Sequence, residues 1–197
     1  MREKTYQRAI DSFRASGGYM SFYQLKEAGV IIRQIHELEE MGAVEKIARG
    51  WYWCRECGLE KPADYKYVEV GLVYPKAVFC LESAGWLNGL TEREPEVLTI
   101  ATDRTDRMKL SFNFPFKRFY LQNAGLDGEI LEKRTALGTY RYYSQERTIC
   151  DTLRLRDKVT PEFLVEVEDI YSSRQNLEAR VLYYAQALRA VRNVQKK

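Results

Sequence analysis

Side chains capable of redox or metal chemistry are sparse in this sequence. Two of its four cysteines, Cys54 and Cys57, have the CxxC spacing of half a zinc site. A tetrahedral site needs four ligands, but there is no second CxxC and the only histidine is His36. A redox role would need a thioredoxin-like βαβ context, which the surrounding pattern lacks. We therefore predict no metal and no cofactor, and interpret both residues as thiols at a strand end.

Hydrolytic chemistry finds equally little support. The sequence has no phosphate-binding glycine loop, no GxSxG and no HExxH, and His36 is the single possible imidazole base. Three aspartates are conceivable metal ligands for a nuclease, but each has an arginine close by in the sequence, so ion pairing is the simpler interpretation. We do not expect an enzyme. The aspartates are Asp103, Asp106 and Asp151, and the arginines among which they lie are Arg104, Arg107 and Arg154.

The polar residues with the clearest pattern lie between Ser21 and Cys54. A short helix is predicted after Ser21 as its cap, and Gly29 ends it. A second helix follows and ends at Gly42. Two β-rich runs, AVEKI and WYWC, then flank a turn at residues 48–50. This order predicts a winged helix-turn-helix, which places its second helix in a DNA major groove.

The second helix of this motif is predicted to turn Ile31, Ile35 and Leu38 inward and Arg33, Glu37 and Glu40 outward. Arginine and glutamine read guanine and adenine edges, and lysine or arginine in the wing meets phosphates. The alternative is a winged helix used only for protein interaction, with this face solvated. The predicted DNA-binding residues are Tyr23, Gln24, Arg33, Gln34, His36, Lys46 and Arg49.

Composition and charge limit the possible partners. The net charge is +3, and residues 1–60 carry nine basic and nine acidic groups. This balance argues against tight non-specific DNA binding and leaves specific binding through a few residues. No apolar run approaches the ~18 residues of a membrane span, and the N-terminus MREKTYQRAI has no apolar signal region. We expect a cytoplasmic protein with no membrane contact.

The pattern along the chain predicts an α+β protein of two domains. The winged helix-turn-helix is assigned to residues 1–57 and opens with a helix through Tyr6, Ile10 and Phe13. Residues 58–65 are predicted to be a linker. Residues 66–197 form a mixed α/β domain that we expect to fold alone. Its predicted strands are YVEVGLVY, VLTIAT, KLSFNF, KRFYLQ, GEILEKR and TYRYYS. Its first predicted helix starts at Pro75, and three further helices are predicted over Gln145–Arg156, Pro161–Tyr171 (after Thr160 as cap) and Asn176–Val194.

A basic run stands out in the C-terminal part. Five cations accompany a single acid, Asp106, and two interpretations remain open. The run is either a solvated loop and strand edge, or a second contact with DNA or with a partner. Its cations are Arg104, Arg107, Lys109, Lys117 and Arg118.

The chain resembles the AbiEi antitoxins of bacterial type IV (AbiE) toxin–antitoxin systems. The resemblance runs from about Ser21 to Leu188 and is carried by EAGV, MGAVEKIARGWYW, YPKAVFCLESAGWLNGLTE, VLTIATDR and YYSQERTICDTLRLRD. The last block, a strand running into S-x-E-R-T-hydrophobic-x-D, is its most specific part. Where family members often have a small polar cap before the recognition helix, this chain has Ile31 and Ile32.

The resemblance implies a transcriptional autorepressor that binds inverted repeats in its own promoter. It also implies a C-terminal antitoxin domain that counteracts a co-encoded nucleotidyltransferase-like toxin, the pair acting in abortive infection against phage. Without a heptad zipper in the sequence, we expect a monomer in solution that pairs on DNA. The alternative is a winged-helix transcription factor whose C-terminal domain senses a ligand or dimerises.

Overall fold

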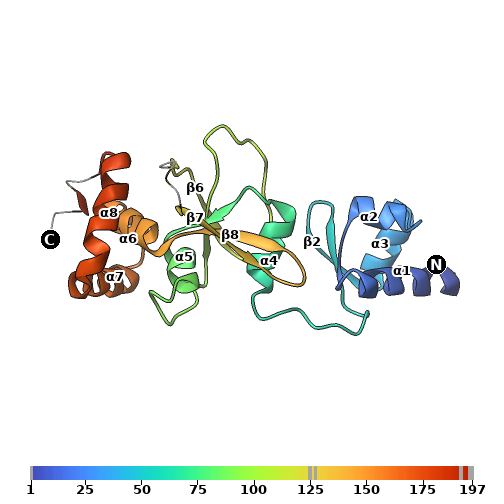
Figure 1. Ribbon diagram of the computed structural model, residues 1–197. Helices are drawn as coiled ribbons and strands as arrows, with labels where there is room; N and C mark the ends of the chain where they lie inside the picture. The colour runs from blue at the N-terminus through green and yellow to red at the C-terminus, as the bar shows by residue number, and fades with distance from the viewer. Residues whose placement is uncertain (1, 124–125, 127, 191–192, 195–197) are drawn as a thin grey trace. The chain divides into compact units, whose positions relative to one another are not determined.

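The computed structural model describes residues 2–123, 126, 128–190 and 193–194, and it confirms an α+β fold (Figure 1). The chain forms two compact units. The first comprises residues 1–75, 108–114 and 134–139, and the second comprises residues 76–107, 115–133 and 140–197. No helix within the described residues is long and apolar enough to cross a membrane.

The first unit contains a three-stranded antiparallel sheet in the order β1-β3-β2. The helices and strands follow the predicted winged-helix order, with β1 as an additional short strand. Their bounds are α1 Glu3–Ala15, β1 Tyr19–Ser21, α2 Phe22–Glu27, α3 Ile32–Glu40, β2 Val44–Ala48, β3 Trp51–Cys54 and α4 Tyr65–Val73.

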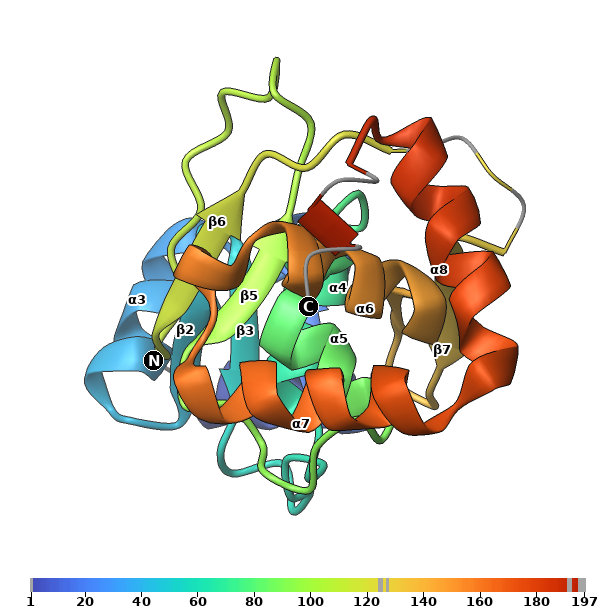
Figure 2. The same ribbon diagram turned by 90° about the vertical axis from the view of Figure 1, so that its left-hand side faces the viewer.

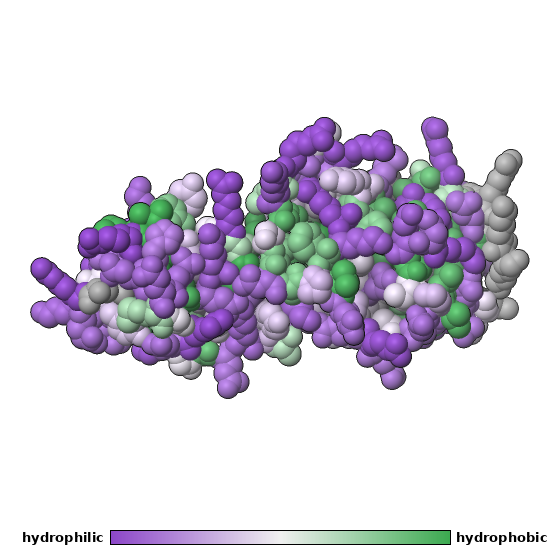
Figure 3. All heavy atoms as spheres, turned by 180° about the vertical axis from the view of Figure 1, so that it is seen from behind, coloured by the Kyte–Doolittle hydropathy of each residue, from purple (hydrophilic) through white to green (hydrophobic). Residues whose placement is uncertain are grey.

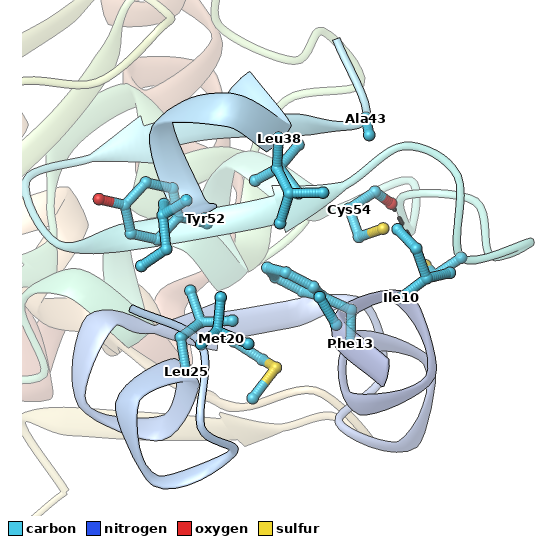
Figure 4. Packing of buried hydrophobic residues seen from close by; sticks show 13 residues of the cluster. Ile10, Phe13, Met20, Leu25, Leu38, Ala43, Tyr52 and Cys54 are labelled. Atoms are coloured by element: carbon cyan, nitrogen blue, oxygen red, sulfur yellow. Dashed lines mark hydrogen bonds between the residues drawn. The ribbon is translucent and has the colours of Figure 1, made fainter. Parts of the chain in front are cut away.

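The core of the first unit lies between its helices and the inner face of its sheet. In Figure 4, Phe13 of α1, Leu25 of α2 and Leu38 of α3 point toward one another. All three side chains are fully buried, and they come from the positions where helical spacing predicted apolar faces. This packing holds α2 and α3 in place, because isolated helices of six and nine residues are not stable in water.

The prediction of a strand at residues 67–74 is wrong, because helix α4 covers most of them. The β-branched and aromatic content of YVEVGLVY favours a strand, but tertiary packing overrides such propensities. In α4, Glu69 is buried and accepts hydrogen bonds from the Tyr19 hydroxyl (3.1 Å) and from Lys61 Nζ (2.7 Å). These bonds make α4 part of the first unit.

The observed division therefore differs from the predicted boundary at residues 58–65. A fragment of residues 66–197 would contain Glu69 without its partners Tyr19 and Lys61, and α4 without most of the unit to which it belongs. It would also carry residues 108–114 and 134–139 without the unit to which they belong. This fragment is therefore not one of the two compact units, in contrast to the prediction that it folds alone.

The second unit is built on a mixed five-stranded sheet in the order β6-β5-β4-β8-β7, whose β7–β8 turn, residues 134–139, belongs to the first unit. Strand β4 pairs antiparallel with β5 and parallel with β8, and β5 pairs parallel with β6. Helices α5, α6, α7 and α8 gather on the same side of this sheet (Figures 1 and 2). The bounds are β4 Val78–Phe79, α5 Leu81–Leu87, β5 Leu98–Ala101, β6 Phe116–Phe119, β7 Ile130–Arg134, β8 Thr139–Tyr143, α6 Gln145–Arg154, α7 Pro161–Ser173 and α8 Gln175–Ala187.

Most predicted elements of this unit are confirmed, with shifted ends, and two are wrong. The helix expected to start at Pro75 starts at Leu81, because residues 78–79 pair with β5 and β8 as strand β4. The strand expected at KLSFNF is absent, and residues 109–114 have no regular structure. Thr160 precedes α7 as predicted, but its side chain makes no capping bond.

Candidate nucleic-acid interface

The helix-turn-helix begins with a capping box at α2. Ser21 Oγ accepts a hydrogen bond from the Gln24 backbone N–H (3.3 Å), and Gln24 Oε1 accepts one from the Ser21 backbone N–H (2.7 Å). The predicted Ser21 cap is thereby confirmed. The Gln24 side chain, which we predicted as a DNA contact, is held at this cap, whereas the Tyr23 side chain is 77% exposed.

Helix α3 presents a different start from the predicted one. We predicted Ile31 as an inward residue, but it is 55% exposed. Its backbone is extended, one residue before the helix, so helical spacing does not apply to it, and Val30 fills the buried position instead. Ile35 and Leu38 are buried as predicted.

Gln34 supplies one half of a capping box at the start of α3, although Ile31 has no polar side chain to supply the other half. Gln34 Oε1 accepts a hydrogen bond from the Ile31 backbone N–H (3.0 Å), one of the N–H groups that a helix start leaves without a partner. This bond engages the carboxamide oxygen that we predicted would read adenine. Gln24 and Gln34 thus act in the same way, each bonding the backbone three residues before it.

Arg33 and His36 extend from α3 into solvent. The Arg33 side chain is 79% exposed, and its Nε lies 3.5 Å from Glu37 Oε1. His36 is 61% exposed, with Nδ1 3.4 Å from Glu39 Oε2. Surface pairs of this kind are worth little, ~0.3–0.5 kcal/mol, so they do not prevent Arg33 from reaching a ligand. The acidic residues are concentrated in the C-terminal half of α3.

The wing is a hairpin of β2 and β3 that turns at Arg49 and Gly50, one residue shorter than the predicted tip because Ala48 belongs to β2. Gly50 has a φ of +75°, a conformation that L side chains rarely adopt. The Phe22 backbone N–H donates to the Gly50 carbonyl (2.8 Å) and ties the wing to the start of α2. Lys46 and Arg49 are both exposed, as phosphate contacts require.

Residues 108–114, here called the wing strap, lie against the wing within the first unit. The Asn113 side-chain amide donates to Glu45 Oε1 (3.0 Å) and to the Lys46 carbonyl (2.9 Å). The Phe114 ring meets Tyr65 edge-on. Because β2 is an edge strand, this bond to Lys46 pairs a carbonyl that the sheet leaves open.

The wing strap also changes the ionisation of Glu45. Burial acts to raise the pKa of Glu45, but hydrogen bonding to Asn113 and the charges of Lys61 and Arg55 outweigh it and hold the pKa below its usual value. A lowered folded-state pKa means that the ionised carboxylate stabilises the fold above the ordinary glutamate pKa of about 4.3, and that this contribution is lost on acidification through the folded-state pKa.

Replacement of Asn113 is therefore expected to have a pH-dependent effect. Asn113→Ala should lower the free energy of unfolding by about 1 kcal/mol at pH 7, and the difference should shrink below pH ~4 as Glu45 becomes protonated. Urea unfolding at pH 7, 5 and 3.5 measures it. Asn123→Ala is the matched control, because its partner is the neutral Tyr143 hydroxyl (2.8 Å). An Asn113→Ala deficit that stays constant down to pH 3.5 would contradict the expectation.

The basic run is divided between the two units. Lys109 is exposed and lies in the wing strap, whereas the other four cations of the basic run belong to the second unit. Among these, Arg118 is a structural residue: its Nε donates to Thr102 Oγ1 (2.5 Å) and its Nη2 to the Asp106 carbonyl (3.3 Å). Arg118 is therefore not among the exposed cations of the run. The exposed members are Arg104, Arg107, Lys109 and Lys117.

The two cysteines of the CxxC motif are core residues. Both are fully buried in the hydrophobic cluster of the first unit, and Cys57 Sγ donates to the Cys54 carbonyl (3.2 Å). Burial raises the pKa of Cys54 to about 12, so its thiol is protonated at neutral pH. Within the described part of the chain, no three His, Cys, Asp or Glu side chains are grouped so as to hold a metal ion.

The three aspartates considered for a nuclease have different partners. Asp103 accepts a hydrogen bond from the Thr105 backbone N–H (2.7 Å), and Asp106 lies 3.6 Å from Arg118 Nη2. Asp151 Oδ1 lies 2.6 Å from Arg154 Nη2. Hydrogen bonding and ion pairing thus account for all three.

A buried arginine is the feature that sequence analysis missed. Arg147 is fully buried in α6, and its guanidinium pairs with Glu129, donates to Asp151 Oδ2 (2.8 Å) and donates to the Gln122 carbonyl (2.7 Å). The Tyr143 ring lies 4.5 Å from its guanidinium carbon. The i,i+4 spacing of Arg147 and Asp151 is the sequence signal for this ion pair, and it lies within the motif that carries the family resemblance.

The first unit has the element order of a winged helix, in which α1, α2 and α3 are followed by the β2–β3 hairpin. No protein-family model matches the chain, and no curated protein matches its sequence. A solved structure with a similar fold is that of the Rv2827c protein of Mycobacterium tuberculosis, with a TM-score of 0.60 and 16% sequence identity. The match covers 99% of this chain and 80% of that chain, and at this identity it shows the fold alone.

Proposed function

We propose that this protein is a DNA-binding transcriptional autorepressor and the antitoxin of a type IV toxin–antitoxin system. The observation that carries the DNA-binding part is the winged helix with Arg33 exposed on α3 and Lys46 and Arg49 exposed on the wing. Arginine on a recognition helix reads base edges, and cations on a wing neutralise phosphates.

The charge balance of the protein fits a specific mode of binding. Residues 1–60 carry no net charge, so general attraction to DNA contributes little, and affinity comes from a few placed contacts. An inverted repeat would present the same contacts to α3 and the wing of each of two copies. We therefore propose promoter DNA with inverted repeats as the nucleic-acid partner.

The antitoxin part of the proposal is supported by the resemblance to AbiEi proteins. Its most specific motif, SQERTICD, builds the buried Arg147 network, so the motif preserves the second unit's core rather than an exposed contact. The partner would be a co-encoded nucleotidyltransferase-like toxin, counteracted in the cytoplasm during abortive infection.

Two measurements test the two parts separately. A gel shift with the DNA upstream of the protein's own gene should show retardation that weakens as salt rises. Co-expression with a neighbouring nucleotidyltransferase-like gene should restore growth of toxin-expressing cells. Absence of retardation at low salt would overturn the repressor, and absence of rescue by soluble, folded protein would overturn the antitoxin.

One observation favours a second function, a winged-helix regulator that senses a ligand. The second unit contains a pocket of about 670 Å³ beside the start of α7, where Glu82, Thr160 and Phe163 are among its lining residues. Ligand pockets commonly have this size. DNA binding without growth rescue, together with a small molecule that alters the gel shift, would favour this alternative.

A further inference from the structure

Two adjacent isoleucines are exposed at the start of α3. Ile31 is 55% exposed and Ile32 is 58% exposed, although Val30 just before them is fully buried. Figure 3 shows a small group of strongly apolar atoms on the first unit amid hydrophilic ones. Ile31 and Ile32 are therefore accessible to a ligand at the start of α3.

The remaining side chains of α3 restrict which part of the helix can approach DNA. Glu37, Glu39 and Glu40 occupy its C-terminal half, where they repel phosphate. The carboxamide oxygen of Gln34 accepts a hydrogen bond from the Ile31 backbone N–H at the helix start. The N-terminal turn is left with Arg33 and the two isoleucines, and N-terminal residues of a recognition helix are the ones that contact base edges.

An aliphatic side chain in the major groove has one favourable base contact, the C5-methyl group of thymine. We propose that Ile31 and Ile32 read thymine methyl groups beside the base contacted by Arg33, so that the operator half-site is specified largely by apolar contact. This inference rests on the proposed DNA-binding function and adds the bases that the site prefers.

Charge favours DNA over a second copy of the chain as the occupant of this surface. Arg33, Lys46 and Arg49 lie on the same helix-turn-helix and wing, and they complement phosphates. A two-fold contact of this surface with itself would bring Arg33 of one copy toward Arg33 of the other, and like charges in such an interface are unfavourable.

Deoxyuridine differs from thymidine by the C5-methyl group alone, so single replacements in a bound duplex test the proposal. The probe is the tightest-binding duplex selected from a random library by the full-length protein. Replacing a contacted thymine should weaken binding about fourfold, the factor that corresponds to ~0.8 kcal/mol for one buried methyl group. Ile31→Ala/Ile32→Ala should bind the thymine and deoxyuridine duplexes equally.

Met41→Ala is the matched control, because Met41 is 59% exposed at the other end of α3 and its loss should leave the thymine preference unchanged. Binding without any thymine preference would overturn this inference and leave the repressor intact. The absence of binding to any duplex would overturn both. A thymine preference that persists in Ile31→Ala/Ile32→Ala would also overturn it. So would a double variant whose only change is in its oligomeric state.

Discussion

An Arg147→Met variant is expected to lose about 3–5 kcal/mol of its free energy of unfolding, because removal of one partner from a buried ionic network leaves the others without compensation. Glu129 and Asp151 are both buried and both pair with this guanidinium. For a chain of this length the loss corresponds to a Tm lower by roughly 6–20 °C. Thermal and urea unfolding measure it, and growth rescue should fall with the folded fraction.

Two further variants make this expectation specific. Arg147→Lys keeps the charge but loses the planar fork that bonds several acceptors together, so its stability should lie between wild type and Arg147→Met. Arg156→Met is the control, since Arg156 is a partly exposed arginine paired with Glu168, and its removal should cost less than about 1 kcal/mol. Equal effects of Arg147→Met and Arg156→Met would show that the buried network contributes no more than a surface pair.

The second large effect concerns operator binding. Arg33→Ala should cost about 1–3 kcal/mol at one base position of the site, a loss of about 5- to 150-fold in affinity, and should relax specificity there. Arg49→Ala should instead weaken binding similarly on all sequences and lower the salt slope by about one, since a phosphate contact carries no sequence information. Titrations of wild type and both variants on the operator and on single-base substitutions separate the two patterns.

A matched arginine outside the winged helix controls for general loss of charge. Arg180 lies on α8, is 60% exposed and pairs with Glu146 at 3.1 Å. Arg180→Ala removes the same charge as Arg33→Ala, and we expect it to leave both affinity and specificity unchanged. If Arg33→Ala weakened all duplexes uniformly, α3 would contact the phosphate backbone rather than base edges.

Local signals explain why the winged helix was predictable from sequence. Ser21 at a helix start, Gly29 and Gly42 after helix ends, and Gly50 in a hairpin turn act within a few residues, and each predicted its element. Residues 67–74 were predicted to be a strand because their β-branched residues favour one when tertiary contacts are not considered. Glu69 of α4 bonds Tyr19, which lies 50 residues away in the chain and is therefore outside any local pattern.

The candidate site shows the same limit. Arg33, Lys46 and Arg49 are exposed as predicted because charged residues on an amphipathic element point outward. The capping use of Gln24 and Gln34 depends on rotamers that spacing does not determine. Likewise, no local signal joins the basic run to the wing, because Asn113 is 67 residues from Lys46 in the chain.

The chain passes between its two units five times, after residues 75, 107, 114, 133 and 139. A gene assembled from two modules by one recombination event would have a single junction, and this gene has none that leaves both units whole. Exchange of the winged helix at one junction would separate residues 108–114 and 134–139 from the unit to which they belong, whereas substitutions on α3 and the wing leave both units whole.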